Sequence, residues 1–179
     1  MLISIVVIVL VIVLVILLMA SMKPGSFRVE RTEVIGAPPE DIFPLLNDFH
    51  RWSAWSPWEK LDPSMKRSFS GAASGVGSVY EWDGNKKAGQ GRMEITDSQP
   101  WSHIGINLDF IKPFEAHNIT EFDLHQHGGG TEVKWAMHGA SPFMTKLMMV
   151  FTTMDKLVGK DFDEGMANVK RVAEAGSAR

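Results

Sequence analysis

The sequence contains no cysteine, and it carries no excess of basic residues over its 179 positions. The absence of cysteine excludes disulfides, thiolate zinc sites, iron–sulfur clusters and cysteine nucleophiles. It does not identify the compartment, because a domain of this size can bury a sufficient core without disulfides. Lys and Arg number 18 against 21 Asp and Glu, which gives a net charge of -3. Nucleic acid is therefore not an expected partner, since its phosphates require a basic surface.

Charge is also missing from the first 22 residues, and Ser4 is the one polar residue between positions 2 and 20. As a helix, residues 2–20 would span about 28 Å, close to the thickness of a bilayer core. We predict a transmembrane helix over residues 1–21, with contact to the membrane through residues 2–20. The alternative is a cleaved signal peptide, which should begin with basic residues and have a shorter apolar stretch. Leu18 also stands where a small residue should precede cleavage after Ala20.

The orientation of this helix is predicted from the basic residues at its two ends. Lys23, Arg28 and Arg31 follow it, whereas the chain offers only its α-amine before it. This distribution predicts a single-pass membrane protein whose soluble domain is cytoplasmic. Glu30 and Glu33 are interleaved with these cations, so a periplasmic or extracellular domain stays open. Residues 22–26 are predicted to be a linker and residues 27–179 a single domain.

After the linker, apolar residues recur every three to four positions in some segments, as in helices, and every second position in others, as in strands. A helix is predicted to begin at Pro38 or Pro39 and to end near Asn47, followed by a short helix or turn over residues 50–60. One long amphipathic helix is predicted over residues 142–175, with a bend or close packing at Gly159 and Gly165. Period-two segments separated by turn residues predict seven strands, at residues 27–35, 66–70, 78–83, 89–97, 101–111, 114–127 and 131–138. This order predicts an α+β fold in which an antiparallel sheet curls around the last helix and encloses a cavity.

Several short motifs carry a family resemblance over residues 27–179. They are Ala37-Pro38-Pro39-Glu40-Asp41-Ile42-Phe43, Trp52-Ser53-Ala54-Trp55-Ser56-Pro57-Trp58, Gly75-Val76-Gly77-Ser78-Val79-Tyr80-Glu81-Trp82, Gly89-Gln90-Gly91-Arg92-Met93, Lys112-Pro113-Phe114 and Gly130-Thr131-Glu132-Val133-Lys134-Trp135. The sequence resembles the START-like SRPBCC superfamily, especially its polyketide cyclase/dehydrase-like branch. The resemblance implies a helix-grip fold with an apolar cavity. It carries over no catalytic set, since no motif matches a characterised active site residue by residue.

Strand parity predicts which side chains face this cavity. On the sixth predicted strand, Phe114, Ala116, Asn118, Thr120, Phe122 and Leu124 share the apolar face, which places Asn118 and Thr120 on an apolar wall. Aromatic and Met side chains with a few polar groups are typical of a small-molecule site, although the same residues also fit a packed core. The predicted ligand-binding residues are Tyr80, Trp82, Met93, Asn118, Thr120, Trp135, Phe151 and Met154.

Two other groups of residues are candidate sites. Trp52, Trp55 and Trp58 fit core packing better than a lid or a membrane-facing patch. His117, Glu121 and His125 lie on the outer face, where His117 and His125 would stand about 26 Å apart, too far to share a metal ion. We expect no metal, no cofactor and no identified catalytic residue.

The sequence therefore supports three hypotheses of function. The first is a membrane-anchored module that binds a hydrophobic small molecule or lipid. The second is a polyketide cyclase/dehydrase-like enzyme, in which a shaped pocket orients a reactive substrate. The third is an interaction domain related to chaperone activators, which would dock an unknown protein partner through its exposed sheet face.

Overall fold

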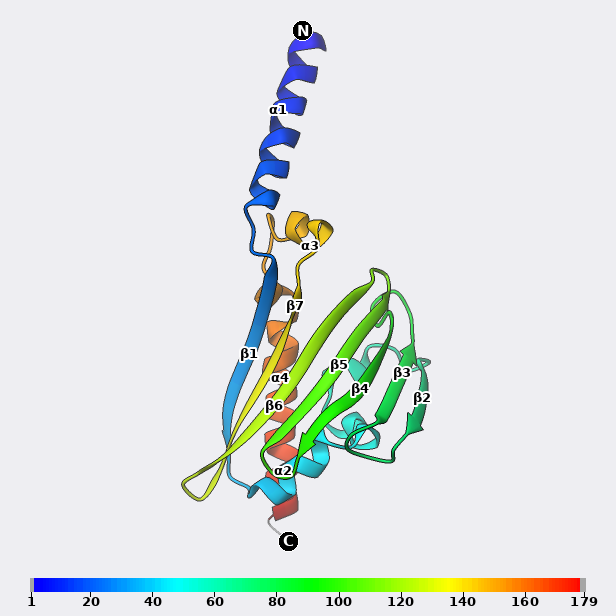
Figure 1. The fold of residues 1–179 in the computed structure, drawn as a ribbon, viewed down its shortest axis with the longest axis vertical. Coiled ribbons are helices and arrows are strands. Elements are labelled where there is room, and N and C mark those ends of the chain that lie inside the picture. The colour runs from blue at the N-terminus through cyan, green and yellow to red at the C-terminus, as the bar shows by residue number, and fades with distance from the viewer. Residues whose placement is uncertain (1, 178–179) are drawn as a thin grey trace.

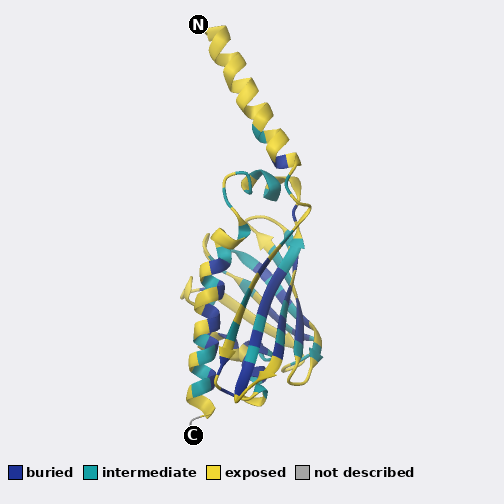
Figure 2. Cartoon of the chain, turned by 90° about the vertical axis from the view of Figure 1, so that its left-hand side faces the viewer, coloured by how far each residue is buried: buried dark blue, intermediate teal, exposed yellow. Residues whose placement is uncertain are grey.

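The computed structural model describes residues 2–177. Residue 1 of the predicted transmembrane helix and residues 178–179 of the predicted domain lie outside the described residues. Helix α1 (Leu2–Ser21) projects from one end of the domain (Figure 1). Its side chains are exposed along nearly its whole length (Figure 2). It is long and apolar enough to cross a membrane, although a signal sequence meets the same test.

The domain is built on one antiparallel sheet of seven strands. The strands are β1 (Ser26–Ile35), β2 (Lys66–Gly71), β3 (Ser78–Asp83), β4 (Gln90–Gln99), β5 (His103–Lys112), β6 (Ala116–His127) and β7 (Gly130–Ala140). Their spatial order is β1-β7-β6-β5-β4-β3-β2, so β2 to β7 form a meander and β1 closes it beside β7. The predicted helix-grip fold, an α+β sheet curled around a C-terminal helix, is confirmed.

Irregular pairing accompanies the curl of the sheet in the middle of the meander. The register of β4 on β5 shifts between Gln90 and Gly91 and again between Ile95 and Asp97. Such bulges increase the local bend and twist of a strand. Gly91 is required here, because a Cβ at this position would collide with the ring of Trp82.

Three short helices fill the concave side of the sheet: α2 (Pro39–Leu46) and the 3-10 helices η1 (Phe49–Ala54) and η2 (Pro57–Lys60). The last carbonyls of a helix lack partners within the helix itself. Two tryptophans supply them, since Trp52 Nε1 donates to the carbonyl of Leu46 at 3.0 Å and Trp55 Nε1 to that of Leu45 at 2.9 Å. Trp52 and Trp55 are buried and Trp58 is partly buried against the same core, which confirms core packing rather than a lid.

The prediction of one helix over residues 142–175 is wrong. The segment forms α3 (Phe143–Met148) and α4 (Met154–Ser177), which are separated by a turn. Thr153 ends this turn, and its Oγ1 accepts a hydrogen bond from the backbone N–H of Lys156 at 3.2 Å. The break separates two packing partners, because α3 contacts α1 whereas α4 packs on the sheet domain. The sequence pattern did not detect it, since the apolar spacing continues across the turn.

Helix α4 lies across the concave face with one apolar side buried. Neither Gly159 nor Gly165 interrupts it. Gly165 allows a close approach to β7, because a Cβ there would stand 2.7 Å from the ring of Trp135. Arg31 on β1 pairs with Asp155 at 2.7 Å and also with Asp163, which ties β1 to α4 at the rim.

The convex face of the sheet is polar and carries His117, which is exposed as predicted. Its Nδ1 lies 2.7 Å from Asp109 Oδ1 on β5. The hydrogen bond to Asp109 raises the pKa of His117 above its usual value. Within residues 2–177, no group of three or more His, Asp or Glu side chains is arranged to hold a metal ion.

Replacing Asp109 with Asn is expected to lower the pKa of His117 toward about 6.5, the value of a free histidine. The pKa of His117 is higher in the folded state than in the unfolded state. The pair of His117 with Asp109 therefore stabilises the fold fully at pH values below the unfolded-state pKa. This contribution is lost as the pH rises through the folded pKa. An NMR titration of the His117 ring measures the change, with Asp83→Asn as a control on a distant strand. A titration curve that Asp109→Asn leaves unchanged would contradict the assignment.

Candidate functional site

A cavity of about 110 Å³ lies between the concave face of the sheet, the η1–η2 segment and α4. Its lining comes from segments distant in sequence. The lining residues are Trp52, Ser56, Trp58, Glu59, Met65, Tyr80, Trp82, Ala88, Met93, Leu108, Phe110, Thr120, Trp135, Met137, Val158 and Phe162. The space is therefore formed by the tertiary fold and not by any one motif.

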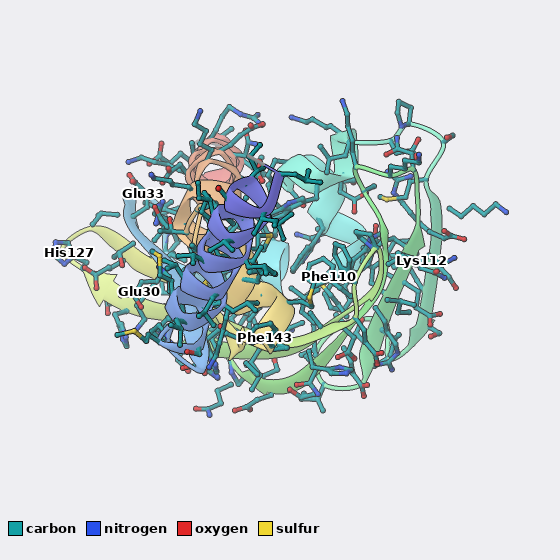
Figure 3. The ribbon with its side chains drawn as sticks, turned by 90° about the horizontal axis from the view of Figure 1, so that it is seen from above. Glu30, Glu33, Phe110, Lys112, His127 and Phe143 are labelled. Carbon is teal, nitrogen blue, oxygen red and sulfur yellow. The ribbon has the colours of Figure 1, made fainter. Side chains whose placement is uncertain are left out.

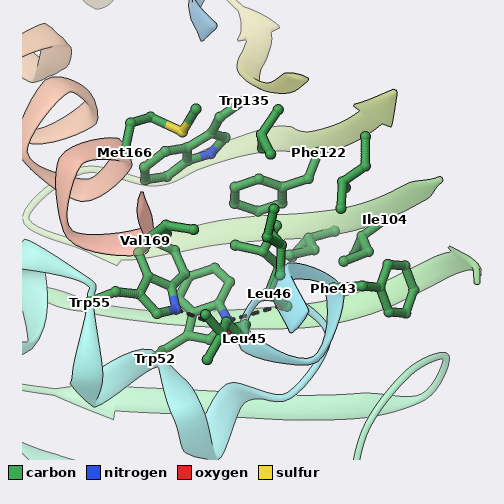
Figure 4. Close-up of a cluster of buried hydrophobic side chains, with 14 of the residues drawn as sticks. Phe43, Leu45, Leu46, Trp52, Trp55, Ile104, Phe122, Trp135, Met166 and Val169 are labelled. Atoms are coloured by element: carbon green, nitrogen blue, oxygen red, sulfur yellow. Dashed lines mark hydrogen bonds between the residues drawn. The ribbon is translucent and has the colours of Figure 1, made fainter. Parts of the chain in front are cut away.

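Aromatic rings form one wall of the cavity. The ring of Trp135 stacks on that of Phe162 with centroids 4.1 Å apart, and Trp58 meets Trp135 edge-on at 5.6 Å. Trp135 also stacks on Phe122 at 5.1 Å, within a cluster of buried side chains (Figure 4). These rings are locked by their neighbours, so this wall of the cavity is preorganised.

One corner of the cavity is polar. The hydroxyl of Tyr80 donates to Glu59 Oε1 at 2.6 Å, and Arg67 Nε donates to Glu59 Oε2 at 2.6 Å. The Glu59 side chain is only 10% exposed, so Arg67 compensates a charge that burial would otherwise penalise. Burial, together with the hydrogen bond to the Glu59 carboxylate, raises the pKa of Tyr80. Tyr80 is therefore a protonated hydrogen-bond donor at neutral pH.

Five of the eight predicted ligand-binding residues line this cavity: Tyr80, Trp82, Met93, Thr120 and Trp135. The other three do not. Asn118 is buried on β6 nearer to α1, and its Oδ1 has no hydrogen-bond partner among residues 2–177. Met154 is half-buried against the core at the start of α4. Phe151 is 73% exposed in the turn before α4, because the helix that was expected to point it inward is broken there.

Phe114 is a further correction to the predicted inward face of the sixth strand. The strand begins at Ala116, and Phe114 lies in the preceding loop with 75% of its surface exposed. Alternation fixes a side chain's face only while the strand continues.

Sequence reasoning missed the contribution of the η1–η2 segment. The sequence predicts a short helix or turn around Trp58 and Glu59, and strand parity gives no direction for side chains in such a segment. Glu59 is the most consequential omission, because among the described residues it is the one carboxylate in the lining. The one sequence feature that could have indicated Glu59 is its position directly after the motif that ends at Trp58. The fold brings Glu59 opposite Tyr80.

Comparison with known proteins identifies the fold. The crystal structure of protein CV1439 from Chromobacterium violaceum aligns with a TM-score of 0.59 at 15% identity, covering 85% of this chain and 99% of that chain. The crystal structure of the di-domain ARO/CYC BexL from the BE-7585A biosynthetic pathway aligns with a TM-score of 0.61 at 14% identity, covering 87% of this chain and 52% of that chain. No curated protein sequence matches the chain.

A family model described as polyketide cyclase / dehydrase and lipid transport matches residues 26–174. The match covers the whole sheet and nearly all of α4. The chain therefore belongs to the polyketide cyclase / dehydrase and lipid transport family.

Proposed function

We propose that this protein is a membrane-anchored module that binds a neutral hydrophobic molecule or lipid in the cavity between the sheet and α4. The observation that carries the proposal is an apolar cavity with one charge-compensated polar corner, in a domain joined to a long apolar helix. A concave apolar site with a few placed polar groups is the usual form of a small-molecule site.

The anchor is α1. Its 20 residues carry no charge and all but Ile16 and Ala20 are exposed, and exposed apolar surface of this length is stable in lipid rather than in water. Lys23, Arg28 and Arg31 follow α1, and basic residues close to the end of a membrane helix favour the cytoplasmic side for the domain. Tethering raises the local concentration of the cavity near ligands that are dissolved in the bilayer.

The polar corner favours a neutral ligand. A ligand carboxylate would meet the carboxylate of Glu59, and no Lys or Arg is among the lining residues to pair with it.

The size of the cavity limits what binds without rearrangement. An apolar cavity of about 150 Å³ holds a benzene molecule, so about 110 Å³ accommodates roughly one ring-sized group. Larger ligands require side chains to move. Leu108, Phe110 and Val158 are among the half-buried residues of the lining, which have room to do so.

Native mass spectrometry of the full chain, released gently from nanodiscs and then extracted for small molecules, tests the proposal. We expect a reproducible neutral hydrophobic adduct. A mass without adduct, even after incubation with membrane lipids, would contradict ligand binding and favour a packed core.

One observation also favours a cyclase/dehydrase-like enzyme: the Tyr80 hydroxyl is held by Glu59 at the cavity wall. Because the single O–H of Tyr80 is already donated to Glu59, its hydroxyl oxygen is available as an acceptor that orients a substrate hydroxyl for reaction. In this case Tyr80→Phe would abolish turnover of a polyketide-like substrate while leaving its binding nearly unchanged. Equal loss of binding and turnover would instead assign Tyr80 to ligand recognition alone.

A further inference from the structure

Exposed apolar side chains gather at the end of the domain from which α1 emerges. Two segments supply them: α3 with the turn after it, and the β5–β6 loop. We call this set the apolar end. It consists of Ile111, Phe114, Phe143, Met144, Met148 and Phe151, which are between 43% and 75% exposed.

The apolar end is held close to α1. Helix α3 contacts α1, and Ala20 in the last turn of α1 is completely buried. The carbonyl of Gly25 accepts a hydrogen bond from the backbone N–H of Ser141 at 2.8 Å, just before α3. Only residues 22–25 separate α1 from β1, and four residues reach at most about 14 Å. A bilayer that contains α1 therefore lies against this end of the domain.

Lysines surround the apolar end. The linker, the β3–β4 and β5–β6 connections with the strand ends that enter them, and the segment from α3 into α4 carry six of them, against the three acids Asp83, Glu115 and Asp155. The lysines are Lys23, Lys86, Lys87, Lys112, Lys146 and Lys156. None of the six forms an ion pair within the described chain, whereas Asp155 is already paired with Arg31. A positive end on a chain of net charge -3 favours contact with anionic lipid.

The cavity approaches the surface at the same end. Ala88, Phe110 and Val158 belong to its lining and are half-buried, at the β3–β4 loop, the end of β5 and the first turns of α4. Seen from the α1 side, Phe110 lies on the inner side of the curved sheet (Figure 3).

We propose that the apolar end is a lipid-contact surface, which sits in the headgroup region of an anionic bilayer and holds the mouth of the cavity against it. Apolar and aromatic side chains bordered by lysines are the pattern of segments that lie in the membrane interface. This inference rests on the proposed role of α1 as the membrane anchor. It adds that the domain itself touches lipid, so that a ligand would pass between bilayer and cavity without crossing water.

The absence of cysteine makes a direct test simple. Single variants Phe114→Cys and Phe151→Cys carry an environment-sensitive fluorophore in the full chain, reconstituted into vesicles of phosphatidylcholine and phosphatidylserine. We expect blue-shifted emission and quenching by nitroxide groups on the lipid, at a depth of about 5–10 Å. Val76→Cys and Gln126→Cys, at the opposite end of the sheet, are matched exposed controls and should report water.

A label at Val9→Cys, in the middle of α1, separates this inference from the proposed anchor. Deep quenching at Val9 with water-like emission at Phe114 and Phe151 would overturn the lipid-contact surface and leave the anchor in place. Water-like emission at Val9 would overturn both. Energy transfer between labels on two copies, without quenching by lipid nitroxides, would assign the surface to a dimer and so overturn the inference. Shallower quenching in vesicles of phosphatidylcholine alone would support the proposal that the lysines attract the domain to anionic lipid.

Discussion

Replacing Trp55 with alanine is expected to lower the free energy of unfolding by about 3–5 kcal/mol, the range for removing a large buried aromatic side chain. Trp55 has no exposed surface, and its ring meets those of Trp52, Phe122 and Trp135. Its indole also donates to the Leu45 carbonyl at the end of α2. The variant loses packing and leaves a helix carbonyl without a partner, so the two costs act together.

Urea denaturation of the full chain in detergent micelles, followed by circular dichroism, measures this loss. Circular dichroism avoids the change in fluorescence that the loss of one tryptophan would cause. Val76→Ala is the control, because Val76 is exposed in the β2–β3 connection, where substitutions usually change stability by less than about 0.5 kcal/mol. A Trp55→Ala variant as stable as this control would show that the aromatic cluster is not the centre of the core.

Replacing Leu108 with tryptophan is expected to weaken binding of a neutral hydrophobic ligand at least about tenfold, which corresponds to about 1.4 kcal/mol. Leu108 lines the cavity and is half-buried. The larger side chain has room to turn partly into the cavity, where it occupies space that a ligand needs. The cost to folding should stay within about 1–3 kcal/mol, the range for overpacked sites.

The matched control is Asn107→Trp, which places the same side chain on the adjacent residue of β5 but on its exposed side. Titration with a fluorescent neutral hydrophobe compares both variants with the parent chain. Equal affinities for all three proteins would contradict a binding site in this cavity. An equal loss in both variants would indicate damage to β5 rather than a filled cavity.

Local patterns in the sequence determined most of the fold. The apolar run before Lys23 predicts α1, and alternation from β1 to β7 predicts the strands and their inward faces. Tyr80, Met93, Thr120 and Trp135 face the cavity because side chains alternate along a strand wherever the strand continues. The same rule fails for Phe114, which stands before β6 begins, and helical periodicity fails for Phe151, where the chain turns between α3 and α4.

Tertiary structure alone decided the composition of the site. Glu59 reaches Tyr80 across 21 positions in sequence, and their contact depends on η2 folding back over the sheet. The break after α3 is likewise invisible in the apolar spacing, because it follows from α3 packing beside α1 while α4 packs on the sheet. The sequence by itself determined which elements form and which faces they bury, since both depend on neighbours along the chain. Long-range packing decides which polar groups meet at the cavity and which apolar groups stay exposed beside α1. Neither outcome can be predicted from the local periodicity of the sequence.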